Sequence, residues 1–209
     1  MIAVHNAEKS PNPVSKGDAT RERILEAAAA QASVRGFAGV SLQEVADAVG
    51  LSKSGLFKHF DAKEAMQLAL LERASARFLA HVWEPSRHLP DARTRLSTVF
   101  DAWLEWVAGA DSPGGCLLTV ASMEMDDQPG LLRDYLRGSL GRWRGRVGAD
   151  FADLADLSED DIDQACFEMK GFVYSYNEQR RLLEDARARE RARTAFTFLL
   201  DRLERRAAA

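Results

Sequence analysis

The sequence predicts an all-α protein with about nine helices. Apolar residues recur every three or four positions through most of the chain, which is the period of an amphipathic α-helix. No stretch keeps the alternation of a β-strand, and glycines and prolines separate the helical segments. The chain has 209 residues, of which 46% are hydrophobic and 29% charged, as in an ordinary globular protein.

The first 17 residues are expected to form a disordered tail, because they contain prolines, asparagines and serines with little apolar content. They also lack the apolar segment of a signal peptide. The rest of the chain is expected to divide into a small domain over residues 18–63 and a larger helical domain over residues 64–209.

Residues 18–35 predict the first helix, which Gly36 ends. Ser41 and Glu44 then have the spacing of a capping box at the start of a second short helix. Gly50 can adopt the left-handed backbone that a tight turn requires. Ser52 is expected to cap a third helix of about two turns, with Leu56 and Phe60 facing inward.

A fourth helix is expected over residues 62–83, with Asp61 and Glu64 at its start. The later helices follow the same apolar spacing. They are expected near residues 91–107, 116–125, 129–143 and 158–176, and a last helix runs to about Arg205 with Ala195, Phe198, Leu199 and Leu203 facing inward.

Residues 41–60 have the layout of a helix-turn-helix, whose second helix enters the major groove of DNA. Residues near the start of such a helix read base edges, and here the candidates are Lys53, Ser54, Gly55, Lys58 and His59. Lysine and serine can hydrogen-bond to bases, and a glycine lets the backbone come close to the groove floor. The net charge of −4 argues against a protein that coats nucleic acid non-specifically.

The stretch from Thr20 to about Leu71 resembles the tetracycline-repressor (TetR) family of transcriptional regulators. The resemblance is carried by Thr20-Arg21-Glu22-Arg23-Ile24-Leu25, Gly36-Phe37, Val45-Ala46, Gly50-Leu51-Ser52-Lys53, Leu56-Phe57-Lys58-His59-Phe60 and Lys63-Glu64. It implies a three-helix DNA-binding head, a connecting fourth helix, and a helical body that binds a small molecule and dimerises. It also implies a dimeric repressor that binds a palindromic operator and leaves it when an effector binds.

The resemblance further implies that Lys53 and Lys63 contact DNA phosphates, with Ser52 at the start of the recognition helix. Helix N-termini at Thr20, Ser41 and Ala62 would offer backbone N–H groups to phosphate oxygens. The family usually has tyrosine where this chain has Phe57, so one phosphate contact through that hydroxyl is absent here.

The larger domain is rich in aromatic residues and methionines, which suit a pocket for a hydrophobic or aromatic effector. Trp103, Met123, Phe167 and Tyr174 are the candidate lining residues. Two alternatives stay open: a DNA-binding regulator without a small effector, and a redox-responsive regulator that uses the thiol of Cys116 at a helix start.

The sequence gives no support for an enzyme or a metal site. It contains no glycine-rich phosphate loop, no His-Glu-x-x-His motif and no zinc-type cysteine spacing, and its four histidines are scattered. No cofactor is expected. The absence of a long apolar run argues against a membrane span, so a cytoplasmic location is expected.

Overall fold

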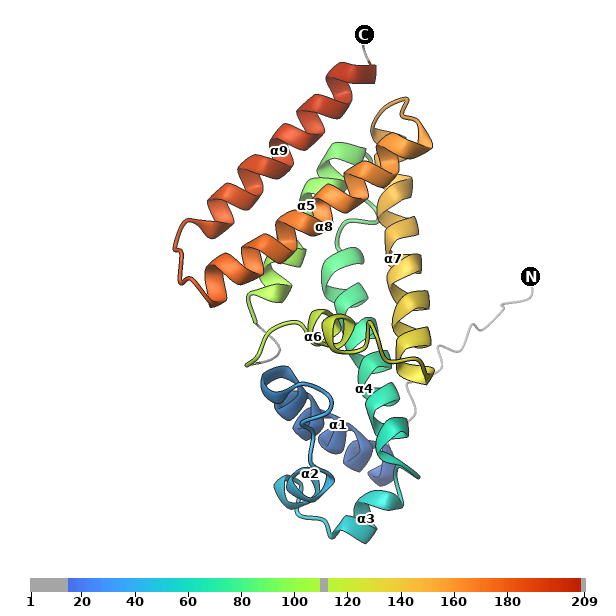
Figure 1. The fold of residues 1–209 in the computed structure, drawn as a ribbon. Helices are drawn as coiled ribbons and strands as arrows, with labels where there is room; N and C mark the ends of the chain where they lie inside the picture. Colours follow the sequence, from blue (N-terminus) through green and yellow to red (C-terminus); the bar gives the residue numbers. More distant parts are fainter. Residues whose placement is uncertain (1–14, 110–112, 208–209) are drawn as a thin grey trace, which may run out of the picture.

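The computed structural model describes residues 15–109 and 113–207 of the chain. These residues form nine α-helices and one π-helical turn, with no β-strand among them (Figure 1). The predicted all-α class and number of helices are confirmed. In chain order the elements are α1 (Lys16–Arg35), α2 (Leu42–Ala48), α3 (Lys53–Phe57), α4 (Lys63–Phe78), the π-helical turn η1 (Leu79–Trp83), α5 (Ala92–Val107), α6 (Leu117–Glu124), α7 (Leu131–Leu154), α8 (Glu159–Arg181) and α9 (Ala188–Ala207).

Helices α1, α2 and α3 lie together at one end of the molecule and are called the head here (Figure 1). Val45 and Ala46 of α2 and Leu56 of α3 are completely buried. Gly50, in the turn between α2 and α3, has a φ of +71°, in the left-handed region that favours glycine. The segment is the expected helix-turn-helix.

Helix α1 begins two residues earlier than the sequence predicts. Ser15 is its N-cap, and the Ser15 hydroxyl accepts a hydrogen bond from the Asp18 N–H at 3.1 Å. Lys16 and Gly17 are therefore helical rather than part of a disordered tail, while residues 1–14 of that predicted tail lie outside the described residues. Thr20 lies inside the first turns of α1, where its hydroxyl donates to the Lys16 carbonyl at 2.9 Å, so the predicted helix N-terminus at Thr20 is wrong.

The expected caps of α2 and α4 are only partly formed. The Ser41 hydroxyl accepts from the Glu44 N–H at 3.4 Å, but the Glu44 carboxylate does not close a capping box, because it pairs with Arg35 at 2.6 Å. Helix α4 has Ala62 as its N-cap with no side-chain hydrogen bond, so Asp61 does not cap it as predicted.

Helix α4 runs from the head into the rest of the molecule, which is called the body here (Figure 1). Arg73 of α4 pairs with Glu22 of α1 at 2.5 Å, which ties the helix to the head beyond its midpoint. Its far end packs into an aromatic cluster, where the ring of Phe78 lies 4.8 Å from Trp143 and 5.7 Å from Trp103, centroid to centroid. The same helix therefore belongs to the cores of both parts.

Helices α5, α7, α8 and α9 form most of the body, and α8 and α9 pack against each other along one side (Figure 1). Helix α7 continues to Leu154, eleven residues beyond the last one that the sequence pattern places in it. In α9, Leu199 and Leu203 are buried as predicted, but Phe198 is 65% exposed, so its predicted inward position is wrong. Among the described residues, no helix has the length and apolar character to cross a membrane.

The buried peptide of Phe37 joins the head to the body. The N–H of Phe37 donates to the Glu124 carboxylate of α6 at 2.6 Å, and the Ala38 N–H donates to the second oxygen of that carboxylate at 2.5 Å. The Phe37 carbonyl accepts from the buried Gln67 side chain of α4 at 2.8 Å. These contacts, called the Phe37 joint here, tie the loop after α1 to both α4 and α6.

Replacing Gly36 by alanine is expected to destabilise the protein more than replacing Gly50. Gly50 has a φ of +71°, where a side chain costs about 1–2 kcal/mol, and Gly36 has φ +77° with ψ 171°, a region that essentially only glycine adopts and that costs about 1–3 kcal/mol. A Cβ at Gly36 would in addition lie 2.7 Å from the Glu124 carboxylate, whereas a Cβ at Gly50 has nothing within 4 Å. Urea unfolding followed by tryptophan fluorescence should give the lower midpoint for Gly36→Ala.

The extra cost at Gly36 should shrink when both variants are compared in a Glu124→Ala background, because the clashing carboxylate is then gone. Equal midpoints for the two single variants would contradict the close approach of Glu124 to this loop.

Candidate nucleic-acid interface and ligand cavity

Helix α3 buries one side and presents the other to solvent. Leu56 is completely buried, whereas Lys53, Ser54 and Lys58 are exposed and Phe57 is 38% exposed. The exposed surface lies at the end of the molecule farthest from the body (Figure 1). No part of the described chain covers these side chains, so they are accessible to a macromolecule.

Two arginines of α1 fix the ends of the turn and of α3. Arg23 donates to the Val49 carbonyl at 2.8 Å, just before the turn. Arg21 donates to the His59 carbonyl at 2.9 Å, and its guanidinium lies 4.1 Å from the centroid of the Phe60 ring. No role for these arginines could be predicted from the sequence, although both lie in the stretch that carries the family resemblance.

The start of α3 is held by Ser52. Its hydroxyl accepts from the Gly55 N–H at 3.0 Å and lies 3.0 Å from the Ser54 hydroxyl. A Cβ at Gly55 would lie 3.3 Å from the Ser52 hydroxyl, so the absence of a side chain there leaves this cap undisturbed. Ser52, Lys53, Ser54 and Gly55 thus share one short, rigid segment.

The other predicted DNA-binding residues lie at several places around the head. The Lys63 ammonium donates to the Ala38 carbonyl at 2.9 Å, which leaves two of its three N–H donors for another acceptor. Ser41 is half-buried at the start of α2, and its N–H donates to the Gln31 side chain at 3.0 Å. His59 is half-buried directly after α3, whereas Thr20 belongs to the interior of α1.

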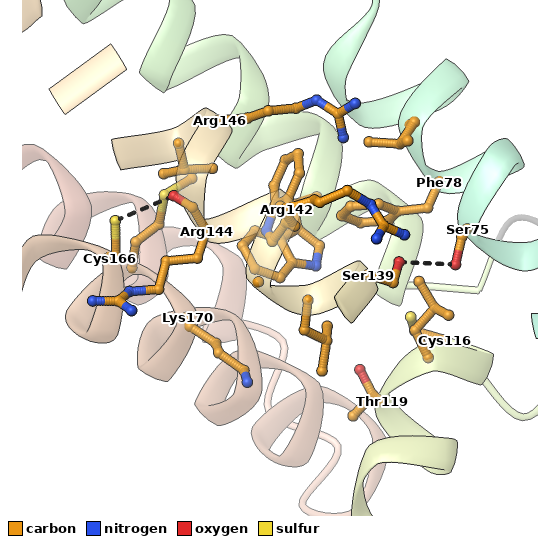
Figure 2. A pocket seen from close by; sticks show the side chains of 18 of the residues that line it. Ser75, Phe78, Cys116, Thr119, Ser139, Arg142, Arg144, Arg146, Cys166 and Lys170 are labelled. Carbon is orange, nitrogen blue, oxygen red and sulfur yellow. Dashed lines mark hydrogen bonds between the residues drawn. The ribbon is translucent and has the colours of Figure 1, made fainter. Parts of the chain in front are cut away.

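A cavity of about 690 Å³ lies in the body, within the size range of small-molecule sites. Its walls come from α4, η1, α5, α6, α7 and α8, and Figure 2 shows them from close by. The apolar wall is largely aromatic. The lining side chains include Phe78, Leu79, Trp103, Leu118, Tyr135, Leu140, Trp143, Val147, Phe167, Met169 and Tyr174.

Three of the four predicted effector residues line this cavity: Trp103, Phe167 and Tyr174. Trp103 is buried, whereas Phe167 is 74% exposed and only borders the cavity. Met123 does not line it and is 59% exposed. The buried side of α6 carries Leu118 and Ala121, and Met123, two residues after Ala121, lies on the opposite side of that helix.

Both cysteines also reach the cavity, and neither has the surroundings of a reactive thiol. Cys116 is buried, and its sulfur accepts a hydrogen bond from the Trp106 indole N–H at 3.3 Å. Burial raises the pKa of the Cys166 thiol to about 11, so it stays protonated at neutral pH. Within the described ranges, no group of three or more His, Cys, Asp or Glu residues could hold a metal ion.

A compact helix-turn-helix head, joined by one long helix to a helical body with a cavity between its helices, defines the class of DNA-binding transcriptional regulators with a separate C-terminal domain. Residues 24–70 match the family of bacterial regulatory proteins described as the tetR family. Residues 92–196 match the tetracyclin repressor-like C-terminal domain. The chain belongs to the tetR family, and it is a transcriptional regulator with a DNA-binding helix-turn-helix rather than an enzyme.

The sequence identity between this chain and individual relatives is low. The chain is 31% identical over 90 residues to the HTH-type transcriptional activator FasR of Mycolicibacterium smegmatis, a match that covers 43% of this chain and 41% of FasR. It therefore spans less than half the length of that relative.

Two solved structures illustrate the shared fold. A TetR transcriptional regulator from Chloroflexus aurantiacus is 26% identical, with a TM-score of 0.74 over 89% of this chain and 94% of its own. AibR, solved in complex with isovaleryl coenzyme A and operator DNA, is 20% identical, with a TM-score of 0.65 over 76% of this chain and 86% of its own. This last likeness shows the fold alone.

Proposed function

We propose that the protein is a dimeric, small-molecule-responsive transcriptional repressor that works in the cytoplasm. Residues 18–63 bind a palindromic operator, and residues 64–209 bind the effector and dimerise. The exposed polar surface of α3 carries the proposal, because a short helix with uncovered lysine and serine side chains suits the major groove.

In this proposal Lys58 and Ser54 contact base edges, Lys53 and Lys63 contact phosphates, and Gly55 lets the helix approach the groove floor. His59 follows directly and lies on the rim of the same surface. Phe57 can pack against the sugar-phosphate edge with the part of its ring that is exposed. The arginines that fix the ends of the segment keep its backbone in one arrangement, so little backbone order has to be gained on binding.

Dimerisation is proposed because one head covers little DNA. A single small module buries roughly 600–1,000 Å² on DNA, and two modules on two half-sites raise both affinity and specificity. Helices α8 and α9 pack together and leave Phe167 and Phe198 74% and 65% exposed. A second copy of the chain would remove these rings from water.

The effector response is proposed to pass through α4 and α6, since each helix contacts both the cavity and the head. Ser75 and Phe78 of α4 and Thr119 of α6 line the cavity. The Phe37 joint ties both helices to the loop after α1. An effector that binds one arrangement of α4 and α6 better than another shifts the population of head positions, and with it the spacing of the two recognition helices.

The proposal is tested by selecting bound sequences from random duplex DNA with the full-length protein. A palindromic consensus, bound with an affinity that falls as salt rises, is the expected result. Selection of no consensus would overturn the proposal.

Lys58→Ala is expected to weaken binding to the selected operator about ten-fold, because a lysine contact to a base or phosphate is lost. Arg133→Ala is the matched control, since Arg133 is exposed on α7 in the body and far along the chain from the head. Titration of labelled operator by fluorescence anisotropy measures both variants. Equal affinities for Lys58→Ala and the control would contradict the assignment of α3 as the recognition helix.

Phe198→Ser is expected to shift the protein from dimer to monomer, because it removes an apolar contact from the proposed interface. Light scattering after size exclusion should give about twice 23.1 kDa for the natural sequence and close to 23.1 kDa for the variant. Val34→Ser removes another exposed apolar side chain, 67% exposed on α1, and should leave the dimer intact. A monomeric mass for the natural sequence would contradict the dimer.

Glu124→Gln is expected to destabilise the protein by about 1–3 kcal/mol, because the charge that accepts two backbone N–H groups is lost. The amides of Phe37 and Ala38 should also exchange hydrogen faster. Glu84→Gln is the control, since Glu84 makes an exposed pair with Arg87 at 2.9 Å and holds no backbone N–H group of the Phe37 joint. Unchanged exchange at Phe37 and Ala38 in Glu124→Gln would contradict the role of this joint.

A further inference from the structure

The cavity is aromatic in its interior but carries an excess of positive charge where α7 and α8 border it. Arg142, Arg144 and Arg146 of α7 and Lys170 of α8 line it. The lining carboxylates are Glu72 and Asp163. The chain as a whole has a net charge of −4, so the sign of this positive cluster is opposite to that of the whole protein.

Arginines elsewhere in the body are mostly paired with carboxylates. Arg93 pairs with Asp201 at 2.5 Å, and Arg95 pairs with Asp150 at 2.6 Å. Arg193 of α9 likewise pairs with an aspartate of α5 at 2.6 Å. Ion pairing is therefore the usual state of an arginine on α5 and α9, whereas the exposed Arg133 and Arg137 of α7 have no carboxylate within ion-pair distance among the described residues.

Two of the three arginines of α7 that line the cavity are likewise without a carboxylate partner in the described part of the chain. Arg144 pairs with Asp163, which neutralises one cation and one carboxylate of the lining. Arg142 and Arg146 have no carboxylate within ion-pair distance among residues 15–109 and 113–207. The Lys170 ammonium lies 5.1 Å from the centroid of the Tyr174 ring and makes no ion pair in the same part of the chain. Two guanidinium groups and an ammonium are thus left against the single carboxylate of Glu72.

Arg142 and Arg146 act from one side of α7, because residues four apart lie one above the other on a helix. Figure 2 shows both guanidinium groups extending from α7 toward α4, on the side of Ser75 and Phe78. The Arg142 guanidinium bends back over Gly138, where a Cβ would lie only 3.3 Å from its nitrogen. Because the Cβ atoms of residues four apart on a helix lie about 5–6 Å from each other, two long arginine side chains at these positions can reach one anion together.

The aromatic wall lies directly beside this pair. Trp143 follows Arg142 in the sequence, lines the cavity and is buried, and its ring lies 5.2 Å from Trp103. A ligand that fills this space meets an apolar surface at one end and two planar, hydrogen-bonding cations at the other. Guanidinium groups bind carboxylates and phosphates with two parallel hydrogen bonds, so the donor set selects for an anion.

We propose that the cavity binds an amphiphilic anion, with an apolar chain or ring against Trp103, Trp143 and Phe78 and a carboxylate or phosphate held by Arg142 and Arg146. This inference rests on the proposed function, in which the cavity is the effector site. It refines the expectation from sequence of a hydrophobic or aromatic effector, which assigned no charge to the ligand.

The test is a titration of the full-length protein with compounds that share one apolar chain and differ only in the head group. Dodecanoate, dodecyl phosphate, dodecan-1-ol and dodecyltrimethylammonium are used below their micellar concentrations at neutral pH. Binding is followed by the quenching of tryptophan fluorescence, because Trp103 and Trp143 line the cavity. Isothermal titration calorimetry gives the stoichiometry.

At least one of the two anions is expected to bind roughly ten-fold more tightly than the alcohol, and the cation more weakly than the alcohol. The relative affinity of dodecanoate and dodecyl phosphate then distinguishes the two kinds of head group. Equal affinities for the anions and the alcohol, or tighter binding of the cation, would overturn the inference.

Arg142→Gln and Arg146→Gln should each reduce the preference for the anion over the alcohol several-fold, while the affinity for the alcohol stays the same. Arg137→Gln is the matched control, since Arg137 is exposed on the same helix and does not line the cavity. Glu72→Gln should act in the opposite direction and strengthen anion binding. An anion preference that survives in the Arg142→Gln, Arg146→Gln double variant would overturn the assignment.

The outcomes separate this inference from the proposed function. If the alcohol binds as well as the anions, the cavity is a binding site without the proposed charge preference, and only the inference fails. If none of the four compounds binds, the inference and the effector site of the proposed function both fail. The DNA-binding part is judged independently by the selection experiment.

Discussion

The position of the head relative to the body depends on how the Phe37 peptide is held. Its side chain is buried, its N–H is bound by Glu124 of α6, and its carbonyl is bound by Gln67 of α4. A buried peptide group that loses its partners costs free energy, so the loop after α1 stays attached to both helices. The arrangement of α3, which rests on α1 through Arg21 and Arg23, follows from this attachment.

The same attachment connects the cavity to the head through α4 and α6. Helices α4 and α6 each give one end to the Phe37 joint and other residues to the cavity wall. Well-packed cores change between discrete arrangements instead of deforming continuously, so a ligand between α4, α6 and α7 has a physical route to the head. In the proposed function, the charge excess at Arg142 and Arg146 selects the ligands that use that route.

Much of the fold could be predicted from the sequence, because local signals specify it. Helical spacing gave the all-α class, and Ser41, Gly50 and Ser52 marked the helix-turn-helix through their caps and turn. The predicted start of α1 was wrong because Ser15, an ordinary N-cap residue, lies in a stretch whose composition indicated disorder. Phe198 was placed inward because α9 has apolar residues on two sides, and sequence periodicity alone does not show which side faces the core.

The candidate sites were less predictable, because their important contacts join distant parts of the chain. Glu124 lies 87 residues from Phe37, and no local pattern relates the two. Arg142 and Arg146 look in the sequence like other arginines on a solvent-exposed helix side. Their significance appears only when the carboxylates around them are located in space. Trp103 was accessible to prediction because a buried tryptophan in a helical bundle is a common pocket wall.

The central claim of this account is that α3 lies in the major groove of DNA at two sites in each dimer. Methylation protection of guanine N7 on the selected operator tests it most directly, because that atom faces only the major groove. The account predicts protected guanines in two half-sites whose centres lie about 34–36 Å apart, or a multiple of this distance. An operator that is fully bound while every guanine N7 stays reactive would contradict it.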